Sequence, residues 1–260
     1  MTRIETQVIA HRGASRMARE NTVEAFRLAA VVGAHAVELD VRRTADGVLV
    51  VHHDPMLPDG RLIAGLDVAD LPAHIPSLTA ALDACTGMWV NVEIKNDPGE
   101  GDFDPTDSIA DHTVALLQAR AEDDRWVISS FRLETVDRCR ALAPAIRTAW
   151  LTYTISDGVV GTIAERGHAA WHPWVGNLTR ALIDEAHASG LQVNTWTCDD
   201  PERMGELVSW GIDGICTNLP DVASLGAHGR RSRGGQAWAG RMSRTASGTC
   251  SNSSRLVSPR

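Results

Sequence analysis

The chain has 260 residues, of which 43% are hydrophobic and 22% are charged, a balance that is ordinary for a soluble globular protein. No apolar run approaches the roughly 18 residues needed to cross a bilayer, and no signal-peptide pattern is present, so we expect a cytoplasmic protein without stable membrane insertion. The five cysteines form no CxxC pair, which argues against a disulfide framework or a zinc site.

The net charge of −8 combines two unlike parts. Residues 1–226 carry a balance of −15, whereas residues 227–260 hold seven arginines, no acidic residue and a net charge of +7. The second part is rich in Ser and Gly and has no periodicity, so we predict one folded domain over 1–226 and a disordered basic tail over 227–260. A nucleic-acid-binding arm is the alternative for the tail, but the acidic body argues against nucleic acid as the main partner. The sequence leaves the oligomeric state open.

Apolar, β-branched segments alternate with helical patterns from residue 7 to residue 218. The first helical pattern has Asn21 or Thr22 as its N-cap, and the second begins after Ser77. Residues 48–55 form a short extended excursion outside this alternation. The eight predicted strands of the alternation are 7–13, 35–44, 88–95, 126–131, 147–152, 169–174, 191–197 and 213–218.

Eight strands separated by seven helical segments predict parallel strands joined by crossover helices. In about 220 residues this pattern is typical of a closed α/β (β/α)₈ barrel, the TIM barrel. A doubly wound open sheet is the alternative. Such a sheet would carry a GxGxxG loop after its first strand, and the sequence HRGAS at 11–15 does not match that motif.

Polar side chains gather at the ends of the first three predicted strands, where barrel enzymes hold their active sites. Each of them alone has an ordinary structural explanation, such as a salt bridge or a solvated loop histidine. Their joint placement favours one active site. They are His11 and Arg12 after the first strand, Glu38 and Asp40 late in the second, Glu93 and Lys95 in the third, and His52, His53 and Asp54 in the excursion.

Alternate residues of a strand share a face, so Glu38 and Asp40 are expected to point the same way, as are Glu93 and Lys95. Carboxylates that converge in a barrel interior are costly to bury without a cation or a shared proton. A set of three oxygen ligands without cysteine suits Mg²⁺ or Ca²⁺. A metal ion, an arginine and the single lysine of the chain would together neutralise a phosphate group, and two histidines could serve as general acid and base. Without a nucleotide loop, cleavage of a phosphodiester is the reaction we expect.

The ordered motifs HRG, ENT, ELDV, TADG, VHHD, VEIK, SSF, WT and GIDGICTNLPD resemble those of the glycerophosphodiester phosphodiesterase family over roughly residues 7–225. The resemblance implies a barrel of the PLC-like phosphodiesterase type. It also implies metal-dependent hydrolysis of a small-molecule glycerophosphodiester to glycerol 3-phosphate and an alcohol, within lipid and glycerol metabolism.

Matched position by position, the resemblance implies a catalytic acid/base pair of His11 and His53, with His52 outside the motif. It implies that Glu38, Asp40 and Glu93 bind a divalent metal ion. It also implies that Arg12 and Lys95 contact the phosphate and that Trp196 packs on the glycerol. Which histidine is the acid stays open, as does attack by water against attack by the neighbouring glycerol hydroxyl through a cyclic phosphate.

Two positions depart from the family pattern. Arg19 replaces a proline before ENT, and Asn218 replaces an aspartate near the last strand. We expect neither residue to touch the metal or the two histidines. The short segment after Lys95 is typical of a compact, bacterial-type cytoplasmic form. Two alternatives remain, a lysophospholipase D-type enzyme with the same site and a catalytically inactive barrel that binds a ligand.

Overall fold

The computed structural model describes residues 5–223, so the predicted tail and Cys250 lie outside the described residues. Within 5–223 the chain forms a nine-stranded sheet in which all strands except β3 run parallel to their neighbours. The sheet closes into a barrel because β1 (Gln7–His11) pairs with both β2 (Ala36–Arg43) and β9 (Gly214–Thr217). The predicted (β/α)₈ barrel is therefore confirmed. The other parallel strands are β4 (Trp89–Ile94), β5 (Trp126–Ser130), β6 (Arg147–Thr152), β7 (Ala170–Pro173) and β8 (Gln192–Thr195).

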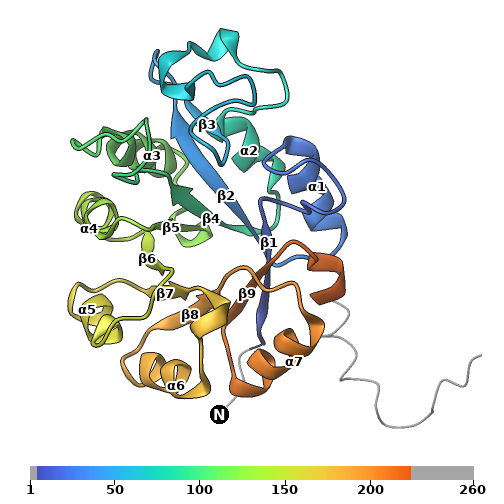
Figure 1. Cartoon of the computed structure of the whole chain (residues 1–260), viewed down its shortest axis with the longest axis vertical. Helices are drawn as coiled ribbons and strands as arrows, with labels where there is room; N and C mark the ends of the chain where they lie inside the picture. Colours follow the sequence, from blue (N-terminus) through green and yellow to red (C-terminus); the bar gives the residue numbers. More distant parts are fainter. Residues whose placement is uncertain (1–4, 224–260) are drawn as a thin grey trace, which may run out of the picture.

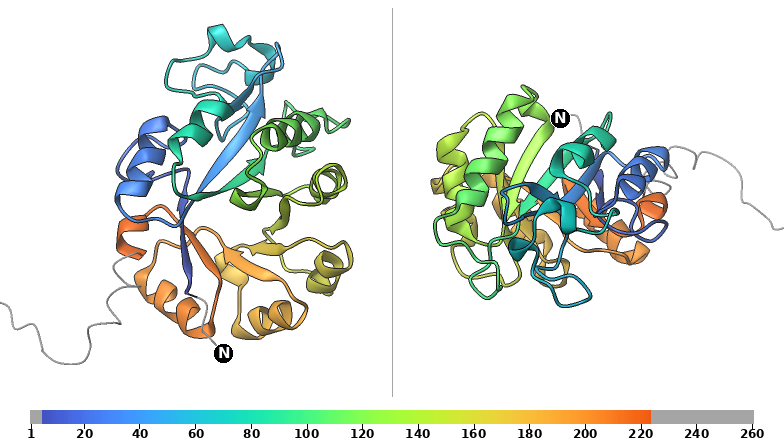
Figure 2. Two further views of the ribbon diagram at one scale, coloured as in Figure 1. Left: turned by 180° about the vertical axis from the view of Figure 1, so that it is seen from behind. Right: turned by 90° about the horizontal axis from the view of Figure 1, so that it is seen from above.

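Helices surround the barrel on the outside, as both faces of the molecule show (Figures 1 and 2). Between residues 5 and 223 they are α1 (Val23–Val31), α2 (Leu78–Ala84), α3 (Ser108–Ala119), α4 (Leu133–Leu142), α5 (Val159–Glu165), α6 (Arg180–Ala188) and α7 (Pro201–Trp210). Short 3₁₀ turns cover Ile63–Gly65, Val68–Asp70, Asp123–Arg125 and Val175–Asn177. None of the helices described in residues 5–223 has the length and apolar character that a membrane span requires.

Side-chain caps fix the start of several helices. The hydroxyl of Thr22 accepts the backbone N–H of Ala25, and that of Ser77 accepts the N–H of Ala80. The sequence allowed Asn21 or Thr22 as the first cap. The structure selects Thr22, because the amide of Asn21 donates to Asp40 inside the barrel mouth instead.

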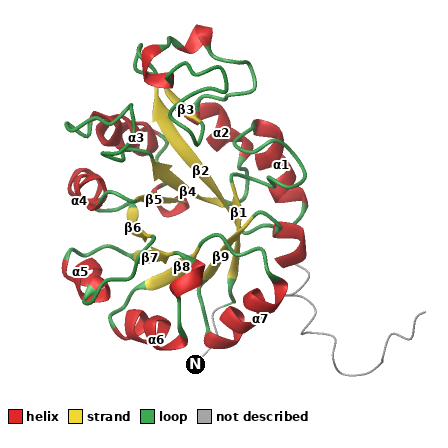
Figure 3. Ribbon diagram, viewed as in Figure 1, coloured by secondary structure: helices red, strands yellow, loops and turns green. Residues whose placement is uncertain are grey.

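The predicted excursion contains β3 (Leu49–Val51), which pairs antiparallel with the end of β2. Figure 3 shows this ribbon standing out from the ring of helices, next to the long loop that leads to α2. Because β3 runs back along β2, it returns the chain to the end of the barrel at which β2 finishes. His52 and His53 follow directly after it.

The main apolar core lies between the barrel and the helices, where Trp126 and Trp171 are fully buried. Inside the barrel, a smaller apolar layer consists of Ile9, Ala36 and Cys216. Above this layer the interior side chains become polar. The fold thus places a dry core around the strands and a polar chamber at their C-terminal ends, which is the arrangement of barrel enzymes.

Candidate active site

Strand register brings the predicted site residues together. His11 on β1 lies directly opposite Glu38 on β2, and Asp40 on β2 lies directly opposite Glu93 on β4. Glu38 and Asp40 are two residues apart and share the inner face. The predicted convergence of the three carboxylates at one end of the barrel is therefore present.

The three carboxylates form a compact group in which one oxygen of each lies within 4.8 Å of the others. All three side chains are buried, and Oε1 of Glu38 has no hydrogen-bond partner within residues 5–223. A buried carboxylate oxygen without a partner, facing other carboxylates, needs a cation or a proton. The donor set consists of oxygens only, so the cluster can hold a hard divalent metal ion.

The pKa values of the three carboxylates reflect their burial and their closeness to one another. Burial raises the pKa of Glu38 well above its ordinary value, and the nearby charges of Asp40 and Glu93 raise it further. Burial also raises the pKa of Glu93, against the opposing effect of Lys95. For Asp40, burial again favours the neutral form, but the cations Lys95 and Arg12 outweigh it and hold the pKa below its usual range. A further cation in the cluster would favour the ionised form of all three carboxylates.

Two cations complete this electrostatic group. The Nζ atom of Lys95 lies 3.0 Å from Oδ1 of Asp40 and is also hydrogen-bonded to Glu93. Burial disfavours the ammonium form, but Glu93 and Asp40 outweigh it and raise the pKa of Lys95. On the other side, Nε of Arg12 lies 3.2 Å from Oδ2 of Asp40, while its Nη1 atom is 3.0 Å from Glu20. The two cations that the sequence predicts to contact the phosphate are thus paired with carboxylates of the same site.

The turn after β1 has a conformation that its sequence explains. Arg12 and Gly13 both have positive φ angles, of 56° and 82°. A Cβ atom on Gly13 would lie 2.7 Å from the backbone carbon of Ala25, so only glycine fits between this turn and α1. The turn directs the backbone N–H of Arg12 to Oε2 of Glu38, at 3.0 Å. It thereby fixes one of the carboxylates.

The two predicted catalytic histidines lie in different surroundings. His11 has its Nε2 atom 3.9 Å from Oε2 of Glu38, and burial, followed by the charge of Arg12, lowers its pKa. His53 is one-third exposed, and its Nδ1 atom lies 2.7 Å from the carboxylate of Asp54. His52 instead faces the backbone oxygen of Asp54 through its Nδ1 atom, at 2.9 Å.

The structure corrects one expectation and adds residues that the sequence did not single out. Asn218 was expected to stay clear of the histidines, but its Oδ1 atom lies 2.8 Å from Nδ1 of His11. The prediction was wrong because the end of β9 closes the barrel directly beside β1. Asn21 donates to Oδ2 of Asp40 at 2.7 Å, and its place in the ENT motif was the only signal for it. Arg42 is fully buried and donates to the backbone oxygen of His53, at 2.8 Å from Nε.

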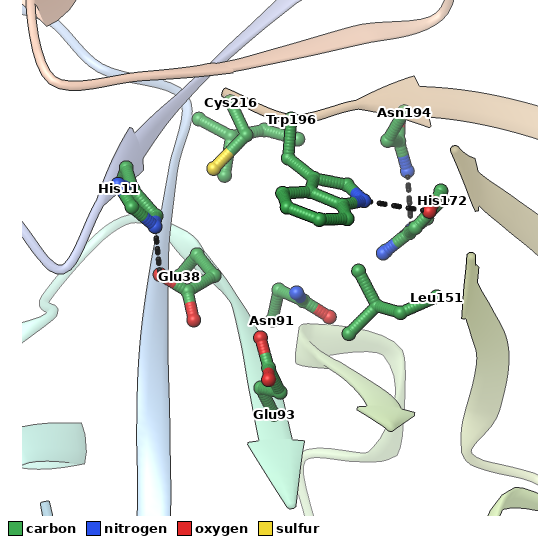
Figure 4. Close-up of a pocket in the computed structure, with 10 residues that line it drawn as sticks. His11, Glu38, Asn91, Glu93, Leu151, His172, Asn194, Trp196 and Cys216 are labelled. Carbon is green, nitrogen blue, oxygen red and sulfur yellow. Dashed lines mark hydrogen bonds and ion pairs between the residues drawn. The ribbon is translucent and has the colours of Figure 1, made fainter. Parts of the chain in front are cut away.

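A narrow pocket, partly open to solvent, adjoins the carboxylates. Figure 4 shows the imidazole of His11 and the carboxylates of Glu38 and Glu93 directed into it, with the indole of Trp196 across from them. The pocket is lined by Ile9, His11, Glu38, Asn91, Glu93, Leu151, His172, Asn194, Trp196 and Cys216.

Trp196 is the aromatic residue among those that line the pocket, and further rings pack around it. Trp196 meets Phe131 edge to face at 5.2 Å, and Tyr153 stacks on Trp174 at 4.9 Å. Nε1 of Trp196 donates to the backbone oxygen of His172 at 2.8 Å, which holds the indole in place. The pocket therefore holds one indole, fixed by a backbone hydrogen bond, in addition to its charged side chains.

Comparison with known proteins gives a consistent result. Residues 11–222 match the model of the glycerophosphoryl diester phosphodiesterase family. A glycerophosphodiester phosphodiesterase of Caldanaerobacter subterraneus subsp. tengcongensis is 30% identical over 244 residues, which cover 84% of this chain and 96% of that one.

Solved structures agree with the sequence match. A glycerophosphodiester phosphodiesterase from Parabacteroides distasonis superposes with a TM-score of 0.78 at 25% identity, covering 88% of this chain and 100% of that one. A phosphodiesterase from Oleispira antarctica, solved in complex with the product sn-glycerol-3-phosphate, has a TM-score of 0.78 at 26% identity and covers 85% of this chain and 96% of that one.

Proposed function

The chain belongs to the glycerophosphoryl diester phosphodiesterase family, and from that premise we propose how its barrel site works. The protein is an enzyme that hydrolyses glycerophosphodiesters to glycerol 3-phosphate and an alcohol. The observation that carries this function is the meeting of an imidazole, three carboxylates and an ammonium group at the C-terminal end of the barrel. Glycerol 3-phosphate is also the product bound to the relative from Oleispira antarctica.

Glu38, Asp40 and Glu93 are the residues that would hold a divalent cation, and Mg²⁺ or Ca²⁺ is the ion we propose. The unpartnered Oε1 atom of Glu38 and the all-oxygen donor set support this choice. A bound cation of this kind supplies positive charge to a phosphate oxygen and keeps all three carboxylates ionised.

Arg12 and Lys95 are proposed to face the phosphate. Both are anchored on Asp40, by contacts of 3.2 and 3.0 Å, so they are held in place before the substrate arrives. An ammonium group has three donors and a guanidinium five, so each cation keeps donors for phosphate oxygens beyond those used on the carboxylates. Trp196, held by His172 across the pocket, is proposed to pack against the glycerol.

His11 and His53 are proposed to move the protons. One ring accepts the proton of the attacking oxygen, and the other donates a proton to the alcohol that leaves. The attacker is either water or the free glycerol hydroxyl next to the phosphate, which would give a cyclic phosphate first. Isolation of a cyclic glycerol phosphate from a brief reaction would support the second route, and its absence at all times would support the first.

The function is tested by assaying the full chain on glycerophosphocholine and glycerophosphoethanolamine with Mg²⁺, with Ca²⁺ and with a chelator. We expect release of glycerol 3-phosphate with at least one of the two ions and its loss on chelation. Full activity in the chelator would refute the metal site, whereas no activity under any condition on any glycerophosphodiester would refute the function.

A lysophospholipase D-type activity is the second candidate, and the cluster of aromatic rings around Trp196 is the observation that favours it. The Tyr153 side chain is 57% exposed although it stacks on Trp174, so an apolar surface is available beside the pocket. Turnover of lysophosphatidylcholine should be compared with that of glycerophosphocholine in the same buffer. A higher kcat/KM for the lysolipid would make it the preferred substrate.

The cytoplasm is the location we propose. Cys85, Cys139, Cys198 and Cys216 are buried free thiols, and burial raises the pKa of the first two to about 12. Buried thiols that stay protonated are inert packing residues, which suits a reducing compartment.

A further inference from the structure

A hydrogen-bonded chain runs from the ends of β8 and β9 to His11. The Oδ1 atom of Asn218 lies 2.8 Å from Nδ1 of His11 and also accepts a hydrogen bond from Ser15. On its other side, the amide Nδ2 of Asn218 donates to Oδ2 of Asp199 at 2.7 Å. The second carboxylate oxygen of Asp199 accepts the backbone N–H of Asn218 at 2.8 Å and the hydroxyl of Thr217 at 2.9 Å.

The donor and the acceptor of each hydrogen bond between Asp199 and His11 follow from the charge of Asp199. Burial disfavours its ionisation, but the hydrogen bonds from Asn218 outweigh burial and lower the pKa of Asp199. An ionised carboxylate only accepts, so the Asn218 atom that faces it is the NH₂ nitrogen. The other end of the amide is then an oxygen, which also only accepts. The hydrogen between Asn218 and His11 must therefore reside on Nδ1 of the imidazole.

We propose that Asp199 and Asn218 are positioning residues that hold neutral His11 in the Nδ1–H tautomer, so that its Nε2 atom faces the pocket as a proton acceptor. This inference rests on the proposed function and assigns His11 the role of base. The proton of the attacking O–H group passes to Nε2 of His11 while the new P–O bond forms. The P–O bond to the leaving alcohol breaks, and that oxygen takes a proton from His53. Exchange of one proton with solvent returns both rings to their starting forms.

Asp199→Asn is the variant that tests this series of hydrogen bonds. The backbone N–H of Asn218 requires an oxygen at position 199, so the new amide would turn its NH₂ group toward Asn218. Asn218 must then rotate its own oxygen to meet that NH₂ group, which places its NH₂ group against Nδ1 of His11. Nδ1 becomes the acceptor, and the hydrogen moves to Nε2. The variant should thus present the wrong tautomer to the substrate while keeping the shape of the site.

Exchanging the two side chains should reverse the effect. In Asp199→Asn/Asn218→Asp, the amide at 199 donates to the carboxylate at 218, and that carboxylate accepts from Nδ1 of His11. The Nδ1–H tautomer is restored with the same number of hydrogen bonds. Aspartate is also the residue that the family pattern has at position 218.

The experiment measures kcat, KM and the tautomer of His11 in the full chain. Long-range ¹H–¹⁵N spectra of protein labelled at histidine give the tautomer, with His11 identified from the His11→Gln spectrum. For Asp199→Asn we expect kcat to fall about 100-fold or more, since general acid–base catalysis contributes about 10²–10⁴-fold, with KM little changed and the hydrogen on Nε2. The double variant should recover kcat to within about tenfold of wild type and carry the hydrogen on Nδ1.

Asp200→Asn is the matched control, because Asp200 caps α7 next to Asp199 and asparagine caps equally well. It should have the wild-type kcat. The inference is overturned if Asp199→Asn keeps the hydrogen on Nδ1, if it keeps the wild-type kcat, or if the double variant fails to restore either quantity. The tautomer is read without turnover, so this result is independent of whether the wild type hydrolyses glycerophosphodiesters.

Discussion

The ammonium nitrogen of Lys95 lies 3.0 Å from Oδ1 of Asp40, so the one lysine of the chain is joined to a carboxylate of the candidate metal site. The same nitrogen is hydrogen-bonded to Glu93 on the neighbouring position of the inner face. A compact ammonium group between two buried carboxylates can neutralise both without a fixed orientation. A guanidinium is planar and must be oriented to bind a carboxylate, so it is a poor substitute.

Lys95→Arg should therefore keep the charge and the fold but lose activity. The guanidinium is larger and cannot sit between the two carboxylates without displacing one of them, so we expect kcat to fall by about 100-fold or more, as for the loss of a preorganised electrostatic group. Kinetics and thermal unfolding would be measured side by side. Arg180→Lys, which exchanges the same two residue types at an exposed position on α6, is the control and should leave kcat and Tm unchanged. Wild-type turnover in Lys95→Arg would mean that the lysine has no special role.

His53 and His52 are adjacent in the chain but should differ in catalysis. His53→Ala should lose about 10²–10⁴-fold in kcat, the usual contribution of a general acid or base. His52→Ala should stay within about threefold of wild type, because its ring faces the backbone of Asp54 and lies outside the motif. Equal losses in both variants would show that the motif alignment picks the wrong histidine or that the loop acts as a unit.

Metal binding should stabilise the protein more at pH 7.5 than at pH 5.5. In the metal-free protein the pKa of Glu38 is raised above its unfolded value, so the stability that this group contributes is complete below about pH 4.3 and is lost as the pH rises through the folded value. Protons compete with the cation for the carboxylate, and this competition weakens as the pH rises. A metal ion at a hundredfold excess over its Kd would add about 2.7 kcal/mol.

Thermal unfolding with Mg²⁺, with Ca²⁺ and with chelator at both pH values checks this prediction. Glu38→Gln should remove most of the metal-dependent rise in Tm, whereas Glu185→Gln, an exposed change on α6, should retain it. A metal-dependent rise that is equal at the two pH values would contradict the prediction.

The barrel could be predicted from the sequence because its evidence is local. Each strand and helix has its own periodicity, and alternate residues such as Glu38 and Asp40 share a face whatever the partner strand is. Contacts that depend on closure of the barrel could not be predicted in this way. His11 and Asn218 are 207 positions apart and meet only because β9 pairs with β1.

Arg42 was missed for a different reason. Of the 25 basic residues all but one are arginines, so nothing in the composition marks an arginine that will be buried. Its partners Glu100 and Asp102 follow 58 and 60 positions later, in a loop without periodicity. The structure shows that this guanidinium also donates to the backbone oxygen of His53, which connects the loop after β4 to the loop that carries a candidate catalytic residue.

Arg42→Lys should therefore lower both stability and kcat. The fully buried guanidinium lies 2.6 Å from the largely buried Asp102, and an ammonium group cannot reach this carboxylate, Glu100 and the His53 carbonyl together. Because the lysine keeps the charge but leaves buried acceptors without donors, we expect a loss of about 1–3 kcal/mol in the free energy of unfolding, and a fall in kcat as His53 loses its anchor. Urea unfolding and steady-state kinetics measure the two effects. Arg43→Lys, the neighbouring and partly exposed position, should cost less than about 1 kcal/mol, and the prediction is wrong if the two variants behave alike.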